Sequence, residues 1–593
     1  MSALLNQAIS LHQLGKLDEA EKLYRDLLGQ EPKQADALAL LGLVRAAKGD
    51  GGEALALIDR AIDADPKSPL FQLHRGNVLA GLKNFPEAAT AFRRAAELQP
   101  SWADAHYNLA NALRGAGDWT GAIASYENAI RAKPNYPEAF NNLALALVHE
   151  KKYEEALAAS KKSVQLAPKY GDGWLTLCNI AEQVKDYPLA VEAGKKNVEF
   201  LPDNHRAWFG YGVALNRVDR NEEAVTAYKR ALELKPDRAD IWDNLGQTYQ
   251  SMNRLDEAEA AFRKTIEVAG QAIPGEGARE VAEEEYGNRH WHLALLELLM
   301  GKYKEGFARY RSRFRDVGGL SRQKFSRPVW KGEDIAGKTV LVTDEQGFGD
   351  TLMLARYLPL MKKRGAKIVF SLHPVLRPLF EGWPAIDRII VHGDTIQSTE
   401  YDFHASVFDL PHIFGTTLET IPTDIPYLPI LPPSEETRLE GDGRPKIGVV
   451  WGGSPLHAND TRRSVPLKIF GELFFDKKFQ FFSLNRDKKA GDIEELPKYP
   501  VTDLAPRIKT FADGARFTQQ MDLIITVDTA TAHLAGGMGK KTWVLLPFAP
   551  DWRWLVGRSD SVWYPATYRL FRQPKISDWQ GAVDQVKEAL EKL

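Results

Sequence analysis

The sequence predicts an α-solenoid of helical repeats followed by a two-lobed α/β region of the Rossmann-like kind. Three observations predict this architecture. Prolines recur every 34 residues as far as Pro236, short β-rich runs alternate with helical segments from Lys338 onward, and a proline-rich stretch divides the β-rich part in two. A chain of 593 residues is long enough for several domains.

The repeat is defined by its prolines and its small residues. The prolines are Pro32, Pro66, Pro100, Pro134, Pro168, Pro202 and Pro236. Alanines stand twelve positions before each proline and once more in the next repeat, at Ala20, Ala54, Ala88, Ala122, Ala156, Ala190, Ala224 and Ala258. An aromatic residue often follows four positions later, one helical turn away on the same face. We expect the alanines to lie where two helices approach closely.

One segment fits the spacing of the tetratricopeptide repeat, a helix-turn-helix unit of 34 residues. Its residues are Trp242, Leu245, Gly246, Tyr249, Ala258 and Phe262. Eight such units fill residues 1 to about 272, although Gly270 stands where the eighth proline is due. The pattern returns farther on with Ala294 and Gly306 at the small positions, which predicts a divergent ninth, capping unit. The predicted array spans residues 1–315.

Stacked repeats of this kind leave one row of helices exposed on a concave surface that binds peptides or proteins. Asparagines are frequent on the first helices of the units, at Asn108, Asn111, Asn141, Asn142 and Asn244. We expect some of them to dock an acceptor protein by hydrogen bonds to an extended backbone. The alternative interpretation is polar residues on a solvated helix face.

The second half has the strand and helix pattern of an α/β fold. Its β-rich runs are KTVLVTD, KIVFSLH, DRIIVHG, YDFHASVF, KIGVVWGG, FQFFSL, LIITVD and KTWVLLPF. The stretch from Pro422 to Pro433 cannot form a regular helix or a central strand, so it predicts a linker between lobes at 325–435 and 440–593. Ser577 and Gln580 have the spacing of a capping box, which predicts a C-terminal helix.

The composition does not favour nucleic acid, an anionic membrane or an intramolecular disulfide. The formal charge of -2 gives no electrostatic reason to favour nucleic acid or an anionic membrane. Cys178 is the single cysteine, so it cannot form an intramolecular disulfide, and a buried thiol is expected. No stretch approaches the roughly 20 apolar residues of a membrane span, and the N-terminus does not resemble a secretory signal. A cytoplasmic location is therefore expected.

The first candidate loop is DEQGFGDTLMLARYLPL, which follows a predicted strand. Ligands of open α/β sheets lie outside the carboxyl ends of the strands. Gly347 and Gly349 would allow close approach of the backbone, and Asp350 could take the proton of an attacking hydroxyl group. The alternative role of Asp350 is a helix cap.

Two further loops follow strands of the second lobe. In WGGSPLHANDTRRSVPL, the hydroxyl of Ser454 and the guanidinium groups of Arg462 and Arg463 would hold the phosphate of a leaving nucleotide; solvated charge is the alternative. In VDTATAHLAGGMGK, Asp528 and Thr529 precede a helix whose free amides form an anion site.

The same helix carries His533, four residues after Thr529 and so on the same face. A ligand-binding role for His533 stands beside the usual alternative, a core histidine with satisfied hydrogen bonds.

These loops resemble those of glycosyltransferase family 9, the heptosyltransferase-like GT-B enzymes, in the branch with N-terminal tetratricopeptide repeats. The resemblance rests on EQGFGDTLMLARYLPL, FGTTLETIP with PYL, VWGGSPLHANDTRRS, VDTATAHLAGGMGK and LLPFAPDWRWL. It implies an inverting, metal-independent enzyme with its nucleotide-sugar donor in the C-terminal lobe. By motif, Asp350 matches the catalytic aspartate, and Asp528, Thr529 and His533 match the donor-binding segment.

The sequence departs from heptosyltransferases in two respects. Arg462 and Arg463 stand where those enzymes have a lysine, so the donor need not be ADP-heptose. The repeats argue for a protein acceptor, as in repeat-bearing O-linked N-acetylglucosamine transferases and bacterial flagellin glycosyltransferases. The similarity to the latter implies transfer of a nonulosonic acid to serine or threonine of flagellin, with a CMP-linked donor expected and UDP-, GDP- and ADP-sugars as alternatives.

We therefore expect a glycosyltransferase that holds its acceptor protein on the repeats. Three alternatives remain. The first is a non-catalytic adaptor whose α/β half senses a nucleotide sugar. The second is a sugar-nucleotide epimerase on the same two-lobed fold, and the third is a heptosyltransferase-like enzyme that acts on a surface polysaccharide.

Overall fold

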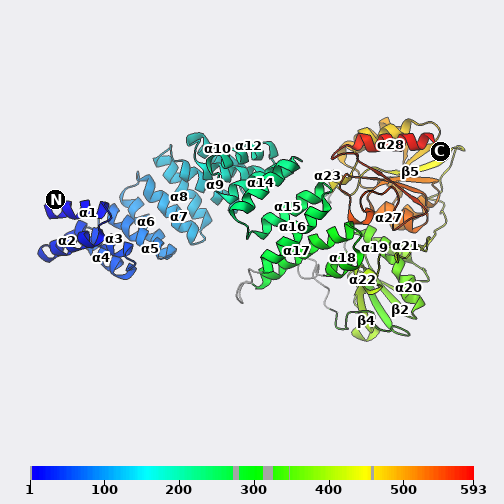
Figure 1. Ribbon diagram of the computed structural model, residues 1–593, viewed down its shortest axis with the longest axis horizontal. Coiled ribbons are helices and arrows are strands. Elements are labelled where there is room, and N and C mark those ends of the chain that lie inside the picture. The colour runs from blue at the N-terminus through cyan, green and yellow to red at the C-terminus, as the bar shows by residue number, and fades with distance from the viewer. Residues whose placement is uncertain (1–2, 271–278, 312–324, 346, 456–459) are drawn as a thin grey trace. The chain divides into compact units, whose positions relative to one another are not determined.

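The computed structural model describes residues 3–270, 279–311, 325–345, 347–455 and 460–593. The chain divides into two compact units, one up to Pro236 and one from Asp237 to Leu593. Antiparallel helices fill the first unit, and helices with two parallel sheets form the second (Figure 1). Among the described residues, no helix is both long and apolar enough to cross a membrane.

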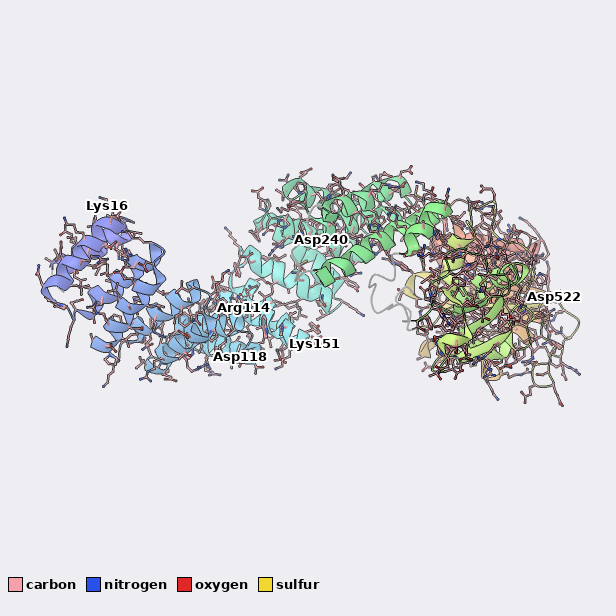
Figure 2. All side chains as sticks on the ribbon, turned by 90° about the horizontal axis from the view of Figure 1, so that it is seen from below. Lys16, Arg114, Asp118, Lys151, Asp240 and Asp522 are labelled. Carbon is pink, nitrogen blue, oxygen red and sulfur yellow. The ribbon has the colours of Figure 1, made fainter. Side chains whose placement is uncertain are left out.

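The first unit consists of paired helices, as the repeat predicts. They are α1 (Ala3–Gln13), α2 (Leu17–Gln30), α3 (Ala35–Ala47), α4 (Gly51–Ala64), α5 (Pro69–Gly81), α6 (Phe85–Leu98), α7 (Ala103–Gly115), α8 (Trp119–Ala132), α9 (Pro137–His149), α10 (Tyr153–Leu166), α11 (Gly171–Gln183), α12 (Tyr187–Phe200), α13 (His205–Arg217) and α14 (Asn221–Leu234). Charged side chains such as Lys16 and Lys151 are exposed at the turns (Figure 2).

The repeated alanines lie where the helices touch, as predicted. All eight, from Ala20 to Ala258, are fully buried. A glycine of the first helix often lies under the aromatic ring of the second: a Cβ added at Gly76 would be 2.5 Å from the ring of Phe92. The prolines follow the end of each second helix, where a residue without an amide hydrogen ends the helix.

A second period of 34 residues is visible only in the backbone. Within each helix pair, the turn contains one residue with positive φ. These residues are Gly15, Gly49, Lys83, Gly117, Lys151, Lys185, Asp219 and Asn253. The left-handed conformation favours glycine, yet the repeat tolerates lysine, aspartate and asparagine there.

The second unit begins with the helices α15 (Ala239–Ser251), α16 (Leu255–Gly270), α17 (Arg279–Leu299) and α18 (Tyr303–Tyr310). With α15 and α16, the repeats amount to eight helix pairs. α17 and α18 form a further helix pair where the sequence predicts a ninth, capping unit, and the assignment of this pair to the repeats stays a prediction. Gly306 lies where α18 crosses α17, because an added Cβ would be 2.7 Å from Cγ of Leu298.

Both sheets of the second unit are parallel. The four-stranded sheet has the order β3-β2-β1-β4, and the six-stranded sheet has the order β10-β9-β8-β5-β6-β7. The strands are β1 (Thr339–Thr343), β2 (Lys367–Leu372), β3 (Arg388–Val391), β4 (Phe403–Ser406), β5 (Lys446–Val450), β6 (Gln480–Ser483), β7 (Val501–Asp503), β8 (Leu523–Val527), β9 (Thr542–Leu546) and β10 (Tyr568–Arg572). All eight predicted strands are present.

The helices around the sheets are mostly short. They are α19 (Phe348–Leu354), α20 (Leu358–Lys363), α21 (Arg377–Phe380), α22 (Leu410–Ile413), α23 (Asp460–Arg463), α24 (Leu467–Phe470), α25 (Ala490–Glu495), α26 (Phe511–Gln519), α27 (Ala530–Gly537) and α28 (Trp579–Glu591). Residues 422–433 form neither helix nor strand, as the prolines predict. Arg356, which follows α19, connects this stretch to the segment that precedes β10. Its side chain donates hydrogen bonds to the carbonyl oxygens of Pro422 (3.1 Å) and Trp563 (2.9 Å).

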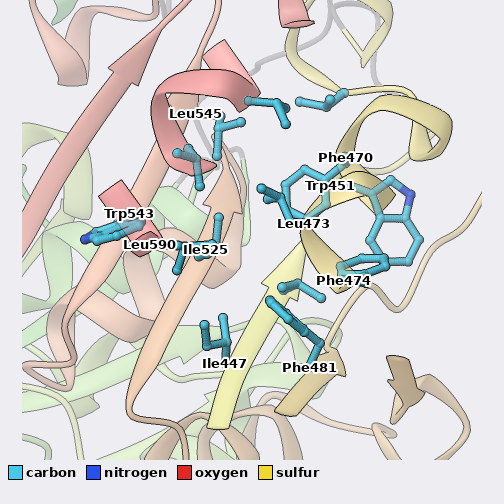
Figure 3. Packing of buried hydrophobic residues seen from close by; sticks show 14 of the residues in the cluster. Ile447, Trp451, Phe470, Leu473, Phe474, Phe481, Ile525, Trp543, Leu545 and Leu590 are labelled. Atoms are coloured by element: carbon cyan, nitrogen blue, oxygen red, sulfur yellow. The ribbon is translucent and has the colours of Figure 1, made fainter. Parts of the chain in front are cut away.

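The core of the six-stranded sheet is rich in aromatic residues (Figure 3). Ile447 and Ile525 project from central strands and pack with Trp451 and with Phe470 of α24. Leu590 of α28 belongs to the same cluster. This packing fixes the strand ends from which the candidate site is built.

The C-terminal helix is capped differently from the prediction. Asp578, not Ser577, is the cap of α28, and its carboxylate accepts a hydrogen bond from the Gly581 amide at 3.0 Å. Ser577 instead has a φ of 64°, so it belongs to the preceding turn. The capping-box spacing was misleading because the true cap stands one position later.

Candidate functional site

Two helices that follow strands of different sheets meet at Gly349. α19 follows β1 of the four-stranded sheet, and α27 follows β8 of the six-stranded sheet. A Cβ at Gly349 would be 2.8 Å from Cδ2 of His533 and 3.3 Å from Cα of Ala530. Gly349 therefore allows α19 to pack closely on α27; the close backbone approach predicted for Gly347 and Gly349 in the site stays a prediction.

Asp350 is the third residue of α19, and two groups hold its carboxylate. The backbone amide of Gly347 donates to Oδ2 at 3.3 Å, which is the helix-capping interaction. Arg553 forms an ion pair with Oδ1. Because Arg553 lies in the short helix η10 (Trp552–Trp554) after β9, this pair joins segments of both sheets.

Arg553 is buried and engages more than one acidic group. Its side chain is 11% exposed, and that of Asp350 is 14% exposed. A second ion pair joins Arg553 to Asp551 at 2.6 Å. Its Nε has no hydrogen-bond partner among the described residues. Arg553 thus forms ion pairs with Asp350 and Asp551, and the charge of Asp528 also acts on its guanidinium group.

Burial shapes the charges of this cluster. It raises the pKa of Asp350 above the ordinary value, against the opposing effect of the Arg553 charge. For Asp528, burial and the charge of Asp551 raise the pKa to about 6, although Arg553 and Arg463 oppose this rise. The cluster can therefore hold a proton in mildly acidic solution, which is a property of many acid–base sites.

His533 lies in an aromatic environment. It is 3% exposed, its ring is stacked on Trp554 with centroids 5.5 Å apart, and its Nδ1 is 3.1 Å from the hydroxyl of Tyr564. Burial lowers its pKa well below the usual value, so the imidazole is neutral. Thr529 is the N-cap residue of α27, and its hydroxyl oxygen is 3.3 Å from that of Thr526.

A pocket of about 880 Å³ lies at the carboxyl ends of β5, β6 and β7. Ser454, Lys488 and Asp503 line it together with apolar side chains such as Ile493 and Leu496. Lys488 pairs with Asp503 at 2.9 Å. Arg486 and Asp487 also line the pocket, which therefore combines apolar walls with several polar and charged groups.

Arg463 lies beside this pocket. A Cβ added at Gly453, the neighbour of Ser454, would be 2.5 Å from Nη2 of Arg463. The Nε of Arg463 is buried without a hydrogen-bond partner among the described residues. Its charge also lowers the pKa of Asp528, so Arg463 is within electrostatic reach of the acidic cluster. Arg462 is exposed.

The asparagines of the repeats are engaged mainly within the array. The Asn142 amide donates to the hydroxyl of Tyr107 (2.9 Å) and to Oδ1 of Asn111 (3.3 Å), which also accepts from Tyr126. Asn141 is 4% exposed, and its Oδ1 has no hydrogen-bond partner among the described residues.

The other two asparagines differ in environment. Asn108 of α7 is half-buried, and Asn244 of α15 donates to the carbonyl of Asp240 at 2.9 Å. A docking role for these asparagines stays a prediction.

Sequence reasoning missed Arg553 and Asp551. The motif that contains them, LLPFAPDWRWL, contributed to the family resemblance but received no role. The available signal was positional, because an acid and an arginine follow strand β9 at the edge where the other candidate loops begin.

Comparisons with known proteins identify the repeats. Residues 5–69, 73–137 and 107–170 match a family described as tetratricopeptide repeat, and residues 219–253 and 239–271 match two further repeat models. The N-terminal half is thus a tetratricopeptide-repeat solenoid.

A curated relative, Protein FlbA of Caulobacter vibrioides, is 27% identical over 328 residues, which cover 50% of this chain. The chain spans about half of that relative, 54% of its length.

Similar solved structures include YrrB, described as a TPR protein with an unusual peptide-binding site, at 24% identity and a TM-score of 0.28; the match covers 30% of this chain and 93% of YrrB. PilF of Pseudomonas aeruginosa is 21% identical with a TM-score of 0.31 and covers 35% of this chain and 93% of its own.

Proposed function

We propose that this chain is a cytoplasmic glycosyltransferase of the GT-B kind that moves a sugar from a nucleotide-sugar donor to a protein docked on the repeats. One observation carries the proposal. Asp350, which follows β1 of the first sheet, forms an ion pair with Arg553, and its neighbour Gly349 packs on His533; Arg553 and His533 both follow strands of the second sheet. In this proposal, the base comes from the segment after the first sheet, and the segment that the family resemblance assigns to the donor follows the second sheet.

The proposed chemistry uses Asp350 as the general base. Its carboxylate takes the proton from a serine or threonine hydroxyl of the acceptor while the hydroxyl oxygen bonds to the anomeric carbon. The bond between that carbon and the nucleotide oxygen breaks, and the nucleotide leaves with the electron pair, which inverts the anomeric configuration. Burial supports this role, because it raises the pKa of Asp350 and makes the carboxylate a stronger proton acceptor.

In this proposal, the donor binds at the carboxyl ends of the strands of the six-stranded sheet. The pocket beside Ser454 accepts the nucleoside, and Arg463 with the first amides of α27 neutralises the phosphate. We propose a CMP-linked nonulosonic acid, with UDP-, GDP- and ADP-sugars as the alternatives. Thermal-shift measurements with CMP, UDP, GDP and ADP identify the nucleotide, since the cognate one raises the unfolding temperature most.

We propose flagellin as the acceptor protein, on the strength of the repeats and of the resemblance to flagellin glycosyltransferases. Intact-mass measurements of flagellin from cells with and without this protein test the acceptor. A mass difference of one sugar is expected. Identical masses would remove flagellin from the proposal, and a survey of other proteins for the same difference would then name the acceptor.

The substitution Asp350→Asn tests the chemistry. It removes the proton acceptor but keeps the shape of the side chain, so transfer should fall by about 10²–10⁴-fold while nucleotide affinity changes little. Initial rates with a fixed acceptor, together with calorimetric titration of the nucleotide, measure both quantities. Full activity of this variant would exclude Asp350 as the base.

A second candidate function is the non-catalytic adaptor. It is favoured by the ion pair with Arg553, because an aspartate whose charge is already neutralised can serve as a structural link between the two sheets. Unchanged masses of all candidate acceptors and no turnover of donor would support the adaptor. Turnover of a nucleotide sugar without any protein acceptor would instead support an epimerase.

A further inference from the structure

We infer that the helix pair α17–α18 positions the Arg553–Asp350 ion pair, so that the last repeat-like unit helps to build the candidate active site. The inference rests on the proposed function, because it assigns a positioning role in a reaction that uses Asp350 as its base. A capping unit of a repeat array normally presents a polar outer face to solvent. Here that face is covered by aromatic residues of the α/β region.

The first contacts join α18 to the segment that carries Arg553. The ring of Phe307 meets the ring of Trp552 edge-on, with centroids 5.7 Å apart and an interplanar angle of 89°. The ring of Tyr303 lies 5.8 Å from that of Trp563, whose Nε1 donates to the Tyr303 hydroxyl at 3.1 Å. Phe307 and Tyr303 are each 1% exposed. α18 is therefore packed tightly against η10 and the segment that follows it.

Trp552 connects α18 to the ion pair. The guanidinium group of Arg553 lies 4.4 Å from the centroid of the Trp552 ring, in cation–π geometry. Phe307 contacts the same ring, and Arg553 in turn binds Asp350. A continuous series of contacts thus leads from Phe307 through Trp552 and Arg553 to the candidate base.

A second anchor joins α18 to the other sheet. Tyr310, at the end of α18, stacks on Phe408 with centroids 5.0 Å apart. Phe408 belongs to the short helix Val407–Asp409 that follows β4, a neighbour of β1. α18 is consequently fixed to segments of both sheets, as is the Arg553–Asp350 pair.

The helix pair is itself held firmly. Glu297 of α17 is 1% exposed and accepts a hydrogen bond from Nε of Arg309 on α18 at 2.9 Å. Gly306 allows the close crossing of the two helices. A rigid support of this kind sets the direction of the Arg553 side chain, and small displacements of a positioned group reduce a reaction rate strongly.

The test is Phe307→Ala in the full chain. We expect kcat to fall about tenfold or more, with the KM for the donor nearly unchanged. Phe307→Leu keeps much of the side-chain volume, so its kcat should lie between those of wild type and Phe307→Ala. The matched control is Phe92→Ala, which removes a buried ring from α6 in the first unit. It should leave the donor KM and the pH profile as they are.

The pH profile separates positioning from mere loss of stability. The charged and titratable groups around the Arg553–Asp350 pair are Asp551 of the η10 segment, Asp528 after β8, His533 of α27 and Tyr310 of α18. Arg553 lowers the pKa of Asp350, so a displaced Arg553 lets that pKa rise. A base must lose its proton to act, and the acidic limb of the rate profile should therefore move to higher pH in Phe307→Ala.

Hydrogen exchange gives a measurement that needs no activity. Peptides that cover residues 548–556 should exchange their amide hydrogens faster in Phe307→Ala than in wild type. In Phe92→Ala, the same peptides should exchange as in wild type. A folded Phe307→Ala protein with wild-type kcat, acidic limb and exchange would overturn the inference. Absence of transfer by the wild type would instead overturn the proposed function, while the exchange comparison would still test the series of contacts.

If Phe307→Ala does not fold, Tyr303→Phe decides the question, since it removes only the hydrogen bond from Trp563. A twofold or larger loss of kcat with the same displacement of the acidic limb supports the positioning role. Wild-type behaviour of that variant overturns it.

Discussion

Asp350 is held by groups that act on its proton affinity in opposite directions. Burial favours the protonated carboxyl, whereas the Arg553 guanidinium favours the carboxylate. The capping hydrogen bond from Gly347 is also present, so the cap and the candidate base are one residue. The two interpretations of Asp350 offered by the sequence are therefore compatible.

Asp528 gives a prediction about stability and pH. Its pKa in the folded chain, about 6, lies above the ordinary value of 3.8, so protonation favours the folded state. The stability that this group contributes is fully present below about pH 4 and is lost as the pH rises through 6. Asp528→Asn lacks this loss, and its stability relative to wild type should increase by roughly 1–3 kcal/mol between pH 4 and 7.

Denaturant unfolding at several pH values, followed by hydrogen exchange of peptides from 523–546, measures this difference in the second unit. Asp522→Asn is the control, because Asp522 is exposed and immediately precedes the same strand. Its stability relative to wild type should change little over this range. Parallel curves for wild type and Asp528→Asn would contradict the prediction.

Among the secondary-structure elements, the contact between α19 and α27 depends on a missing side chain. Gly349→Ala would place a Cβ 2.8 Å from the ring of His533, in a region without free space. We expect a loss of about 1–3 kcal/mol in the stability of the second unit, and lower transfer activity because α19 carries Asp350. Thermal unfolding and initial rates measure the two effects.

Gly514→Ala is the matched control for this prediction. Gly514 lies inside α26, and an added Cβ would be 3.7 Å from Leu534, an ordinary contact. Alanine is a better helix former than glycine, so this variant should be as stable as wild type or about 1 kcal/mol more stable. Equal destabilisation of both variants would show that the Gly349 contact has no special importance.

For the molecule as a whole, the boundary of the second unit predicts which fragments fold. Residues 237–593 keep the contacts of Tyr303, Phe307 and Tyr310 with the α/β region. We expect this fragment to unfold cooperatively and to bind nucleotide. A fragment 325–593, cut at the predicted start of the first lobe, exposes Trp552 and Phe408 and should aggregate or unfold at a clearly lower temperature.

Circular dichroism during heating, with light scattering, compares the two fragments. The asparagine side chain of Asn253 adds a further contact in the longer one, since it donates to the carbonyl of Phe548 at 2.7 Å. Equal unfolding temperatures would mean that α15–α18 contribute nothing to the stability of the α/β region.

Local patterns were sufficient to predict most of the elements. The helix pairs follow from the spacing of alanines and prolines, and eight strands follow from β-rich runs between breakers. The two strands that were missed, β7 and β10, lie at the two edges of their sheet. Val501–Asp503 has only three residues, and Tyr568–Arg572 contains two arginines, so neither shows the apolar run of a central strand.

By itself, the sequence determined the repeat, the α/β character of the second half and the strand ends where Asp350, Ser454 and Asp528 stand, because each depends on residues close together in the chain. Only the tertiary structure decided that Arg553 neutralises Asp350, that Gly349 packs on His533 and that α18 covers Trp552. These contacts join residues that are far apart in the chain: Gly349 and His533, Asp350 and Arg553, and Phe307 and Trp552. Such contacts arise from the packing of whole helices and sheets, which no local spacing encodes.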